Sequence, residues 1–278
     1  MTFANASGAR IEAPSDADTD GYVTKASTNG GNVLPLANLA TVTRGGITRF
    51  GPTTVDGRSA IMHRIRQGDP LRNNGDRSEL IYGGFNFANG EDVWFAAAYK
   101  FDADCDPATS GGAGDGMLIQ QTHQNATSAG PIGNPFSLTL IGGGSAQGLN
   151  WVVSYQGNDY MLYRTPIAVG QWMRVITHYR SGFTASGHAP VMEAWVAYGN
   201  GGYTKLSSLP GTSANQQFGE PLSTPGSNND APKIGLYKWT WGNWGSSPSR
   251  TVYSSGLYAS KGSSLFNEAA AALTAAGF

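Results

Sequence analysis

The chain has 278 residues and a formal net charge of −1, and only 13% of its residues are charged, about half the ~25% of an average globular protein. With no basic excess to neutralise phosphates, it is not expected to bind nucleic acid, and 40% hydrophobic residues exclude the composition of a disordered chain. No stretch approaches the ~18 consecutive apolar residues of a membrane span, so no membrane partner is expected.

The N-terminal region is weakly patterned. Residues 1–45 are rich in Thr, Asn and Ala and predict either an irregular arm or an early strand pair. The first residues carry no basic segment followed by an apolar one, so no signal peptide is present in this chain. We expect a secreted protein whose signal peptide is absent here, or a component of a phage particle. No composition shift marks a second domain, so residues 1–278 are expected to form one.

Short β-rich runs alternate with Gly, Pro, Asn and Ser turns along the rest of the chain. Strands are predicted at 60–66, 78–82, 93–101, 117–123, 136–140, 151–155, 172–179, 191–198, 233–239 and 251–259. This pattern is typical of an all-β jelly roll, a sandwich of two antiparallel sheets with a concave substrate groove. The alanine-rich tail, 264–276, predicts a short C-terminal helix.

Three predicted strands carry polar side chains on one face. Residues two apart in a strand share a face, so Arg77 lies beside Glu79 and Gln121 beside His123. The third strand has the longest such row, formed by Lys233, Gly235, Tyr237, Trp239 and Trp241. If the three strands pair within one sheet, these side chains converge, and Gly235 is expected to leave open space for a ligand.

This set of side chains suits the β-elimination of a uronic-acid polymer. Arg, Lys and Gln donors neutralise the sugar carboxylate and so stabilise the enolate that forms when the C5 proton leaves. A His removes that proton. A Tyr hydroxyl near a cation protonates the leaving oxygen, because nearby positive charge lowers its pKa. Trp239 and Trp241 are expected to stack on sugar rings.

Arg77-Ser-Glu-Leu, Gln121-Thr-His123 and Lys233-Ile-Gly-Leu-Tyr237 resemble, in this order, the three blocks of β-jelly-roll polysaccharide lyases, alginate lyases among them. The segment 57–69 and Gly170-Gln-Trp172 are more similar to the heparin-lyase-like and glucuronan-lyase-like branch. The resemblance covers about residues 50–260. It implies that His123 is the base and Tyr237 the acid, or that Tyr237 is both, while Arg77, Gln121 and Lys233 hold the carboxylate.

The sequence also bears on the substrate. Ala231-Pro232 and Ile81-Tyr82 stand where alginate lyases usually carry a Tyr-Phe pair and another arginine, and the near-zero net charge does not suit a densely sulfated heparin. An anionic, non-sulfated glucuronate polymer such as glucuronan is therefore the expected partner, with alginate as an alternative. A non-catalytic, lectin-like sandwich and a glycoside hydrolase also stay open. The hydrolase needs two carboxylates about 5–9.5 Å apart, and the acids in or beside predicted strands form no convincing pair.

The remaining candidates are less specific. Glu79, Tyr155 and His178 are expected to bind substrate; His178 shares a face with Trp172, which suits either a groove border or a structural role. His63 is expected in the core or at its rim. Alternating aspartates at 102, 104 and 106 are compatible with a structural calcium but lack the spacing of a calcium-binding helix–loop–helix motif. No catalytic metal or other cofactor is expected, and the protein is expected to be a monomer.

Overall fold

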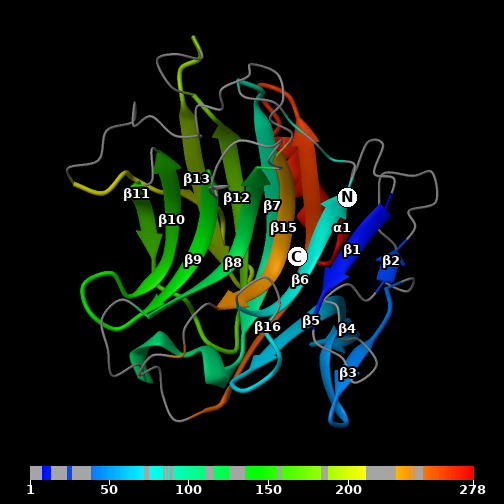
Figure 1. The fold of residues 1–278 in the computed structure, drawn as a ribbon. Coiled ribbons are helices and arrows are strands. Elements are labelled where there is room, and N and C mark those ends of the chain that lie inside the picture. Colours follow the sequence, from blue (N-terminus) through cyan, green and yellow to red (C-terminus); the bar gives the residue numbers. More distant parts are fainter. Residues whose placement is uncertain are drawn as a thin grey trace.

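The computed structural model describes residues 8–13, 24–26, 39–71, 75–83, 85, 87, 90–109, 115–124, 135–155, 158–182, 187–210, 230–238, 241 and 247–278. Within these residues, the strands form two eight-stranded sheets in which every pair of neighbours is antiparallel. The sheets lie one behind the other in Figure 1. The predicted two-sheet jelly roll is therefore confirmed.

Sheet A contains, in spatial order, β11 (Asn158–Thr165), β10 (Gly148–Tyr155), β9 (Phe136–Gly142), β8 (Asp115–Gln124), β15 (Asp230–Lys238), β6 (Asp76–Gly83), β1 (Gly8–Glu12) and β2 (Thr24–Ala26). Sheet B contains β14 (Thr204–Lys205), β13 (Val191–Tyr198), β12 (Trp172–Arg180), β7 (Val93–Phe101), β16 (Ser249–Lys261), β5 (Arg58–Arg66), β4 (Ile47–Val55) and β3 (Val42–Arg44). Two short 3₁₀ turns, η2 (Ala103–Cys105) and η3 (Pro107–Thr109), follow β7.

All ten predicted strands are present, with small shifts at their ends. The early strand pair that was one alternative for the N-terminal region is formed by β1 and β2. Strand β4 was not predicted because Gly51 and Pro52 interrupt its pattern, although Pro52 pairs with Ile61 in β5. Strand β11 was not predicted either, because its polar start, Asn158-Asp159, resembles a turn.

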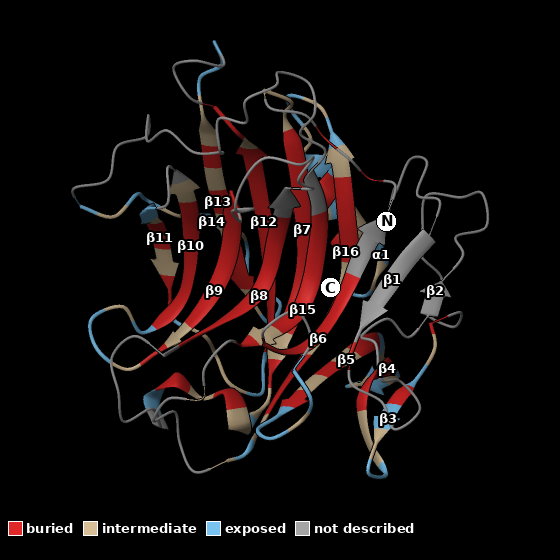
Figure 2. Cartoon of the chain, in the orientation of Figure 1, coloured by how far each residue is buried: buried red, intermediate tan, exposed pale blue. Residues whose placement is uncertain are grey.

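The main core lies between the sheets, where side chains alternate inward along each strand. Phe136, Leu138 and Leu140 of β9 all point into it and are fully buried. Figure 2 shows that burial is continuous across the middle strands of both sheets. The inward-facing residues thus fix which side chains of sheet A face away from the core, and we call that side the outer face of sheet A.

A second apolar cluster covers the other side of sheet B. The predicted C-terminal helix is present as α1 (Phe266–Ala275), and its Ala269 and Leu273 pack in the cluster that contains Ala96 and Ala98 of β7. Small side chains on the strand allow the helix to lie close to the sheet. No helix among the described residues is long and apolar enough to cross a membrane.

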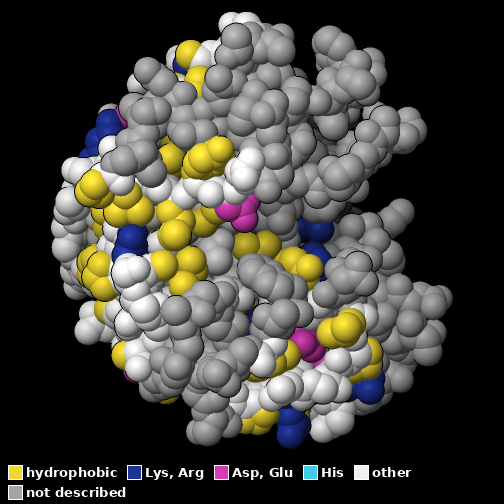
Figure 3. Space-filling view, turned by 60° about the vertical axis from the view of Figure 1, so that its left-hand side comes forward, with side chains coloured by type: hydrophobic (Ala, Val, Ile, Leu, Met, Phe, Trp, Pro, Cys, Tyr) yellow, Lys and Arg dark blue, Asp and Glu magenta, His cyan; other side chains and the backbone are white. Residues whose placement is uncertain are grey.

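Seen from the β11 side, the described residues expose apolar side chains among scattered Lys, Arg, Asp and Glu groups (Figure 3). This agrees with the low charged content of the sequence.

Candidate active site

The three strands that carry the candidate residues are neighbours, in the order β8, β15, β6. Lys233 of β15 lies opposite Gln121 of β8, and Tyr237 of β15 lies opposite Arg77 of β6. The core takes the side chains that alternate with these, such as Leu236. The structure therefore brings Arg77, Gln121, Lys233 and Tyr237 together on the outer face of sheet A.

Glu79 connects two of these residues. Nη1 of Arg77 donates a short hydrogen bond to Oε2 of Glu79, and Nε2 of Gln121 donates to Oε1 at 2.5 Å. Glu79 is only 1% exposed, so its charge is stabilised by these partners rather than by water. The expectation that Glu79 binds substrate is corrected here, because both of its oxygens already accept from the protein. It orients Arg77 and Gln121 instead.

Two residues that share a face, Arg77 and Gly75, contact the ring of Tyr237. The guanidinium carbon of Arg77 lies 3.8 Å from the ring centroid, a cation–π contact. Two residues earlier, Gly75 approaches so closely that a Cβ there would lie 2.1 Å from Cε2 of Tyr237. Gly75 was not singled out from the sequence, and the available signal was a glycine on the same strand face as Arg77. Tyr237 itself is half-buried, whereas Arg77, Gln121 and Lys233 are buried.

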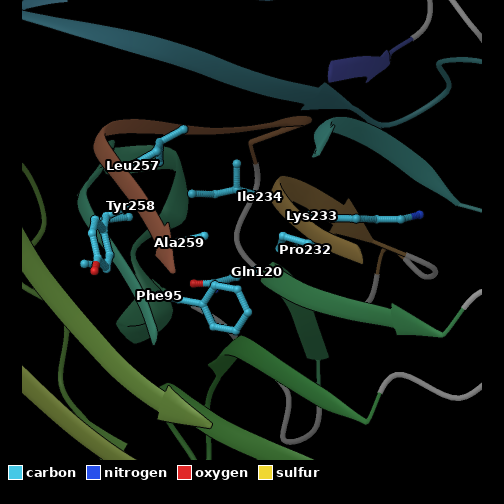
Figure 4. A pocket seen from close by; sticks show the side chains of 10 residues that line it. Phe95, Gln120, Pro232, Lys233, Ile234, Leu257, Tyr258 and Ala259 are labelled. Carbon is cyan, nitrogen blue, oxygen red and sulfur yellow. The ribbon is translucent and has the colours of Figure 1, made fainter. Parts of the chain in front are cut away.

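The side chain of Lys233 belongs to the outer face, although Lys233 and its strand neighbours also line a pocket inside the sandwich. The pocket lies between the sheets and is lined mainly by apolar residues of β7, β15 and β16, with Gln120 of β8. Figure 4 shows the Lys233 side chain directed away from this pocket. Gln120 points into the core, where its Oε1 accepts from the hydroxyl of Tyr99 at 3.0 Å. Lys233 thus borders the pocket, while its side chain points to the candidate site.

Three predicted site residues lie wholly or partly outside the described part of the structure. His123 belongs to β8, where it pairs with Ala231 two positions beyond Gln121, but its side chain is not described. The same holds for Tyr155 in β10, and Trp239 lies outside the described residues altogether. Their predicted roles stay predictions.

The open space expected beside Gly235 is not there. Its φ is +135°, and a Cβ would lie 2.2 Å from the carbonyl oxygen of Ser78 and 2.6 Å from Nδ1 of His63. The pairing of β15 shifts register between Ile234 and Tyr237, which rotates this position out of the simple alternation. Gly235 is therefore needed for close packing and opens no room for a ligand.

His63 is a core residue, one of the two alternatives expected for it. It is fully buried; Nδ1 donates to the carbonyl of Ser78 at 2.9 Å, and Nε2 accepts from the hydroxyl of Ser254 at 2.9 Å. Because a backbone carbonyl only accepts, the proton is on Nδ1. Burial lowers the pKa of His63 to about 4.

Trp241 does not lie on the face of Tyr237. β15 ends at Lys238, so the alternation cannot be extended to position 241. The ring instead packs against the core between the sheets, and its Nε1 donates to Oδ2 of Asp76 at 2.5 Å. Burial raises the pKa of Asp76, and this hydrogen bond opposes the rise. The predicted sugar-stacking role of Trp241 is therefore wrong.

His178 is also remote from the candidate site. It stacks on Trp94 at 4.2 Å between ring centroids, and Trp94 belongs to the cluster beneath α1. Its ring nitrogens contact Asp92 at 2.8 Å and Glu193 at 2.9 Å. The expectation that His178 borders the groove is wrong, because His178 lies in sheet B and stacks on a residue of the cluster beneath α1. Since Asp92 and Glu193 lie here too, they form no pair with Glu79.

The aspartates of the 102–106 segment serve the backbone. Asp102 accepts from the N–H of Ala103, Asp104 from the N–H and hydroxyl of Thr251, and Asp106 from the N–H of Ala108. No group of three or more His, Cys, Asp or Glu residues within the described ranges is arranged to hold a metal ion.

Comparison with known proteins agrees with this architecture. The family model described as "Polysaccharide lyase" matches residues 17–257. No significant sequence match was found among curated proteins.

Solved structures with a similar fold include several alginate lyases. A family 7 alginate lyase in complex with a product superposes with a TM-score of 0.53 at 15% identity, covering 92% of this chain and 96% of its own. An alginate lyase from Pseudomonas aeruginosa gives 0.51 at 16% identity, with 93% and 100% covered. One from Klebsiella pneumoniae gives 0.54 at 13%, with 93% and 97% covered. At these identities the likeness concerns the fold.

Proposed function

We propose that this chain, which belongs to the polysaccharide lyase family, cleaves a uronic-acid polysaccharide by β-elimination on the outer face of sheet A. The observation that carries the proposal is the meeting of Arg77, Gln121, Lys233 and Tyr237 on three adjacent strands. Two cations, an amide and a phenol side by side suit a sugar acid better than a neutral sugar. A lectin would not need a proton carrier among them.

Elimination begins with neutralisation of the sugar carboxylate. Hydrogen bonds from Arg77, Gln121 and Lys233 stabilise the negative charge that spreads onto this carboxylate as the C5 proton leaves. Arg77 and Gln121 keep their orientation because Glu79 accepts from both. Pre-oriented donors need no reorganisation during the reaction, which favours the transition state over the bound substrate.

Two proton transfers complete the reaction. A base takes the C5 proton, the electron pair forms the C4–C5 double bond, the C4–O bond breaks, and an acid protonates the leaving oxygen. Tyr237 is the proposed acid, because its half-buried phenol stands beside Arg77. His123, two positions beyond Gln121 in β8, is the proposed base; alternatively Tyr237 serves as both base and acid, on one side of the sugar.

Product chemistry tests this proposal directly. Wild-type protein is incubated with uronate polymers and both reducing ends and ultraviolet absorbance are followed, since elimination leaves an absorbing unsaturated uronate and hydrolysis does not. We expect both signals together. Reducing ends without absorbance would indicate a hydrolase, and binding without either signal a lectin-like protein.

The Tyr237→Phe variant tests the site. It is expected to abolish turnover while polymer binding stays measurable, because only the hydroxyl is removed. Tyr253→Phe is the matched control, since Tyr253 is a partly buried tyrosine packed in the cluster on the other side of sheet B. Equal turnover of the two variants would remove Tyr237 from the mechanism.

The preferred substrate we propose is a non-sulfated glucuronate polymer such as glucuronan. The departures from the alginate-lyase blocks at 81–82 and 231–232 support it, whereas the alginate lyases among the similar folds favour alginate. Initial rates on glucuronan, alginate, hyaluronan and heparan at equal uronate concentration decide between them. Action on such a polymer outside the cell, by a secreted protein, is part of the same proposal.

A further inference from the structure

A line of paired residues crosses sheet A from the candidate site to its edge. Tyr237 lies opposite Leu118, Leu118 opposite Thr139, Thr139 opposite Asn150, and Asn150 opposite Arg164. All five face away from the core, since the core takes the residues that alternate with them. Neighbouring strands are about 4.8 Å apart, so β11 is roughly 19 Å from β15, measured across four spacings.

Among the described residues, Arg164, at the end of this line, has no hydrogen-bond partner. Its Nε is buried and makes no hydrogen bond, and within the described residues no carboxylate or carbonyl engages its guanidinium. Arg49, Arg174 and Arg250 also have one buried nitrogen that makes no hydrogen bond. Each of those, however, is held through another nitrogen: Arg49 by Asp69, Arg174 by the carbonyl of Gly201, and Arg250 by the carbonyls of Ser247 and Ser249. A buried Nε without an acceptor is unusual in a folded protein.

The path between the two ends carries no negative charge. Leu118 is apolar, the Thr139 hydroxyl contacts the hydroxyl of Ser137 at 3.1 Å, and Asn150 is neutral. The amide of Asn150 is used within its own turn, where Nδ2 donates to the carbonyls of Ala146 and Gly148 at 3.0 and 2.8 Å. Leu118, Thr139 and Asn150 are themselves buried, so a polymer that runs from Tyr237 to Arg164 passes over groups that carry no negative charge. The described side chains on this side of the molecule are mainly apolar, with both Lys or Arg and Asp or Glu groups among them (Figure 3).

We propose that Arg164 forms a distal subsite that binds the carboxylate of a second uronate unit, several sugars away from the bond cleaved at Tyr237. A guanidinium presents parallel N–H groups that match the two oxygens of a carboxylate. This inference rests on the proposed function, since it extends the same substrate along the same face. It explains why a cation without a protein partner stands in line with the candidate active site.

The test is the Arg164→Gln variant, assayed on long polymer and on oligosaccharides too short to extend from Tyr237 to β11. For the polymer, KM is expected to rise about tenfold with kcat unchanged, the loss typical of a charge-assisted hydrogen bond; for short substrates neither constant should change. Arg66→Gln is the matched control, because Arg66 is an exposed arginine of β5 in the other sheet and should leave both constants unchanged.

Direct binding separates recognition from turnover. Calorimetric titration of polyuronate into Tyr237→Phe and into the double variant with Arg164→Gln should give about tenfold weaker binding in the latter. With a carboxyl-reduced, neutral polymer the two should bind equally. If Arg164→Gln fails to fold, Arg164→Lys keeps the charge without the paired N–H groups and should give an intermediate KM.

The outcomes distinguish this inference from the one before it. If wild-type protein forms unsaturated products and Arg164→Gln matches Arg66→Gln in KM and in binding, the distal subsite is refuted while the lyase activity stands. If wild-type protein forms no unsaturated product from any polyuronate, the proposed function fails first.

Discussion

Gly75→Ala tests whether the position of the Tyr237 ring matters for turnover. The substitution adds one methyl group on the face of β6 that carries Arg77. The backbone of Gly75 lies outside the left-handed region, so an alanine is not strained there for conformational reasons. Any effect must come from what the new methyl group contacts, and the nearest atoms belong to Tyr237.

The size of the effect follows from the distances. The new Cβ would lie 2.1 Å from Cε2 of Tyr237 and 2.9 Å from the carbonyl oxygen of Lys238, whereas ordinary contact begins at 3.4 Å. The ring edge must therefore move by at least 3.4 − 2.1 = 1.3 Å. A displacement of ~1 Å from the productive geometry can cost about 100-fold in rate, which corresponds to about 2.7 kcal/mol in the activation barrier.

Steady-state kinetics on the best polyuronate check this prediction. We expect kcat to fall about 100-fold, with a smaller change in KM, because the atoms nearest the new methyl group belong to Tyr237 and Lys238 and not to Gln121 or Lys233. Gly202→Ala is the control, since no heavy atom lies within 4 Å of its added methyl group. Denaturant unfolding confirms that each variant is folded. A folded Gly75→Ala with the kcat of Gly202→Ala would refute the idea that the phenol must be held in this position.

Three further variants address the charges around the site. Glu79→Gln leaves Arg77 buried without its counter-charge, so denaturant unfolding should show a loss of about 3 kcal/mol and kcat should fall; unchanged stability would refute the pairing. His123→Ala should lower kcat if the imidazole is the base, whereas a rise in KM alone would make it a binding residue. The pKa of His63 is about 4 in the folded protein and ~6.5 in the unfolded chain. Between these pH values only the unfolded chain binds a proton at His63. The free energy of unfolding should therefore fall, by up to about 3 kcal/mol, as pH falls from 6.5 to 4. His63→Gln should remove that part of the pH dependence, and an unaltered profile would contradict it.

Alternation along strands predicted which side chains of each strand share a face at the candidate site, but not which strands are neighbours. Arg77 and Glu79 are two apart in a regular strand, and so are Gln121 and His123, hence each pair is assigned to one face. The adjacency of β8, β15 and β6 could only be assumed, because pairing between segments distant in sequence leaves no mark on either segment. The resemblance to known lyases supplied that missing step.

Alternation failed where the backbone departs from a regular strand. The register shift before Tyr237 and the end of β15 at Lys238 explain the wrong expectations for Gly235 and Trp241. His178 failed for a different reason. Alternation says which residues share a face, but not whether that face is open or, as here, part of the cluster packed under α1.

Gly235 shows how the core and the candidate site depend on one position. In the register of the sheet it lies opposite Glu79, and the strand that contains it separates Glu79 from Gln121. Because position 235 adds no side chain to the outer face, the 2.5 Å hydrogen bond between Gln121 and Glu79 can cross β15. On the inner side, the missing Cβ admits the ring of His63. The space that the sequence suggested for a ligand is thus used by the protein itself. On the outer face it allows the hydrogen bond that orients Gln121, and on the inner face the ring of His63 packs against β15.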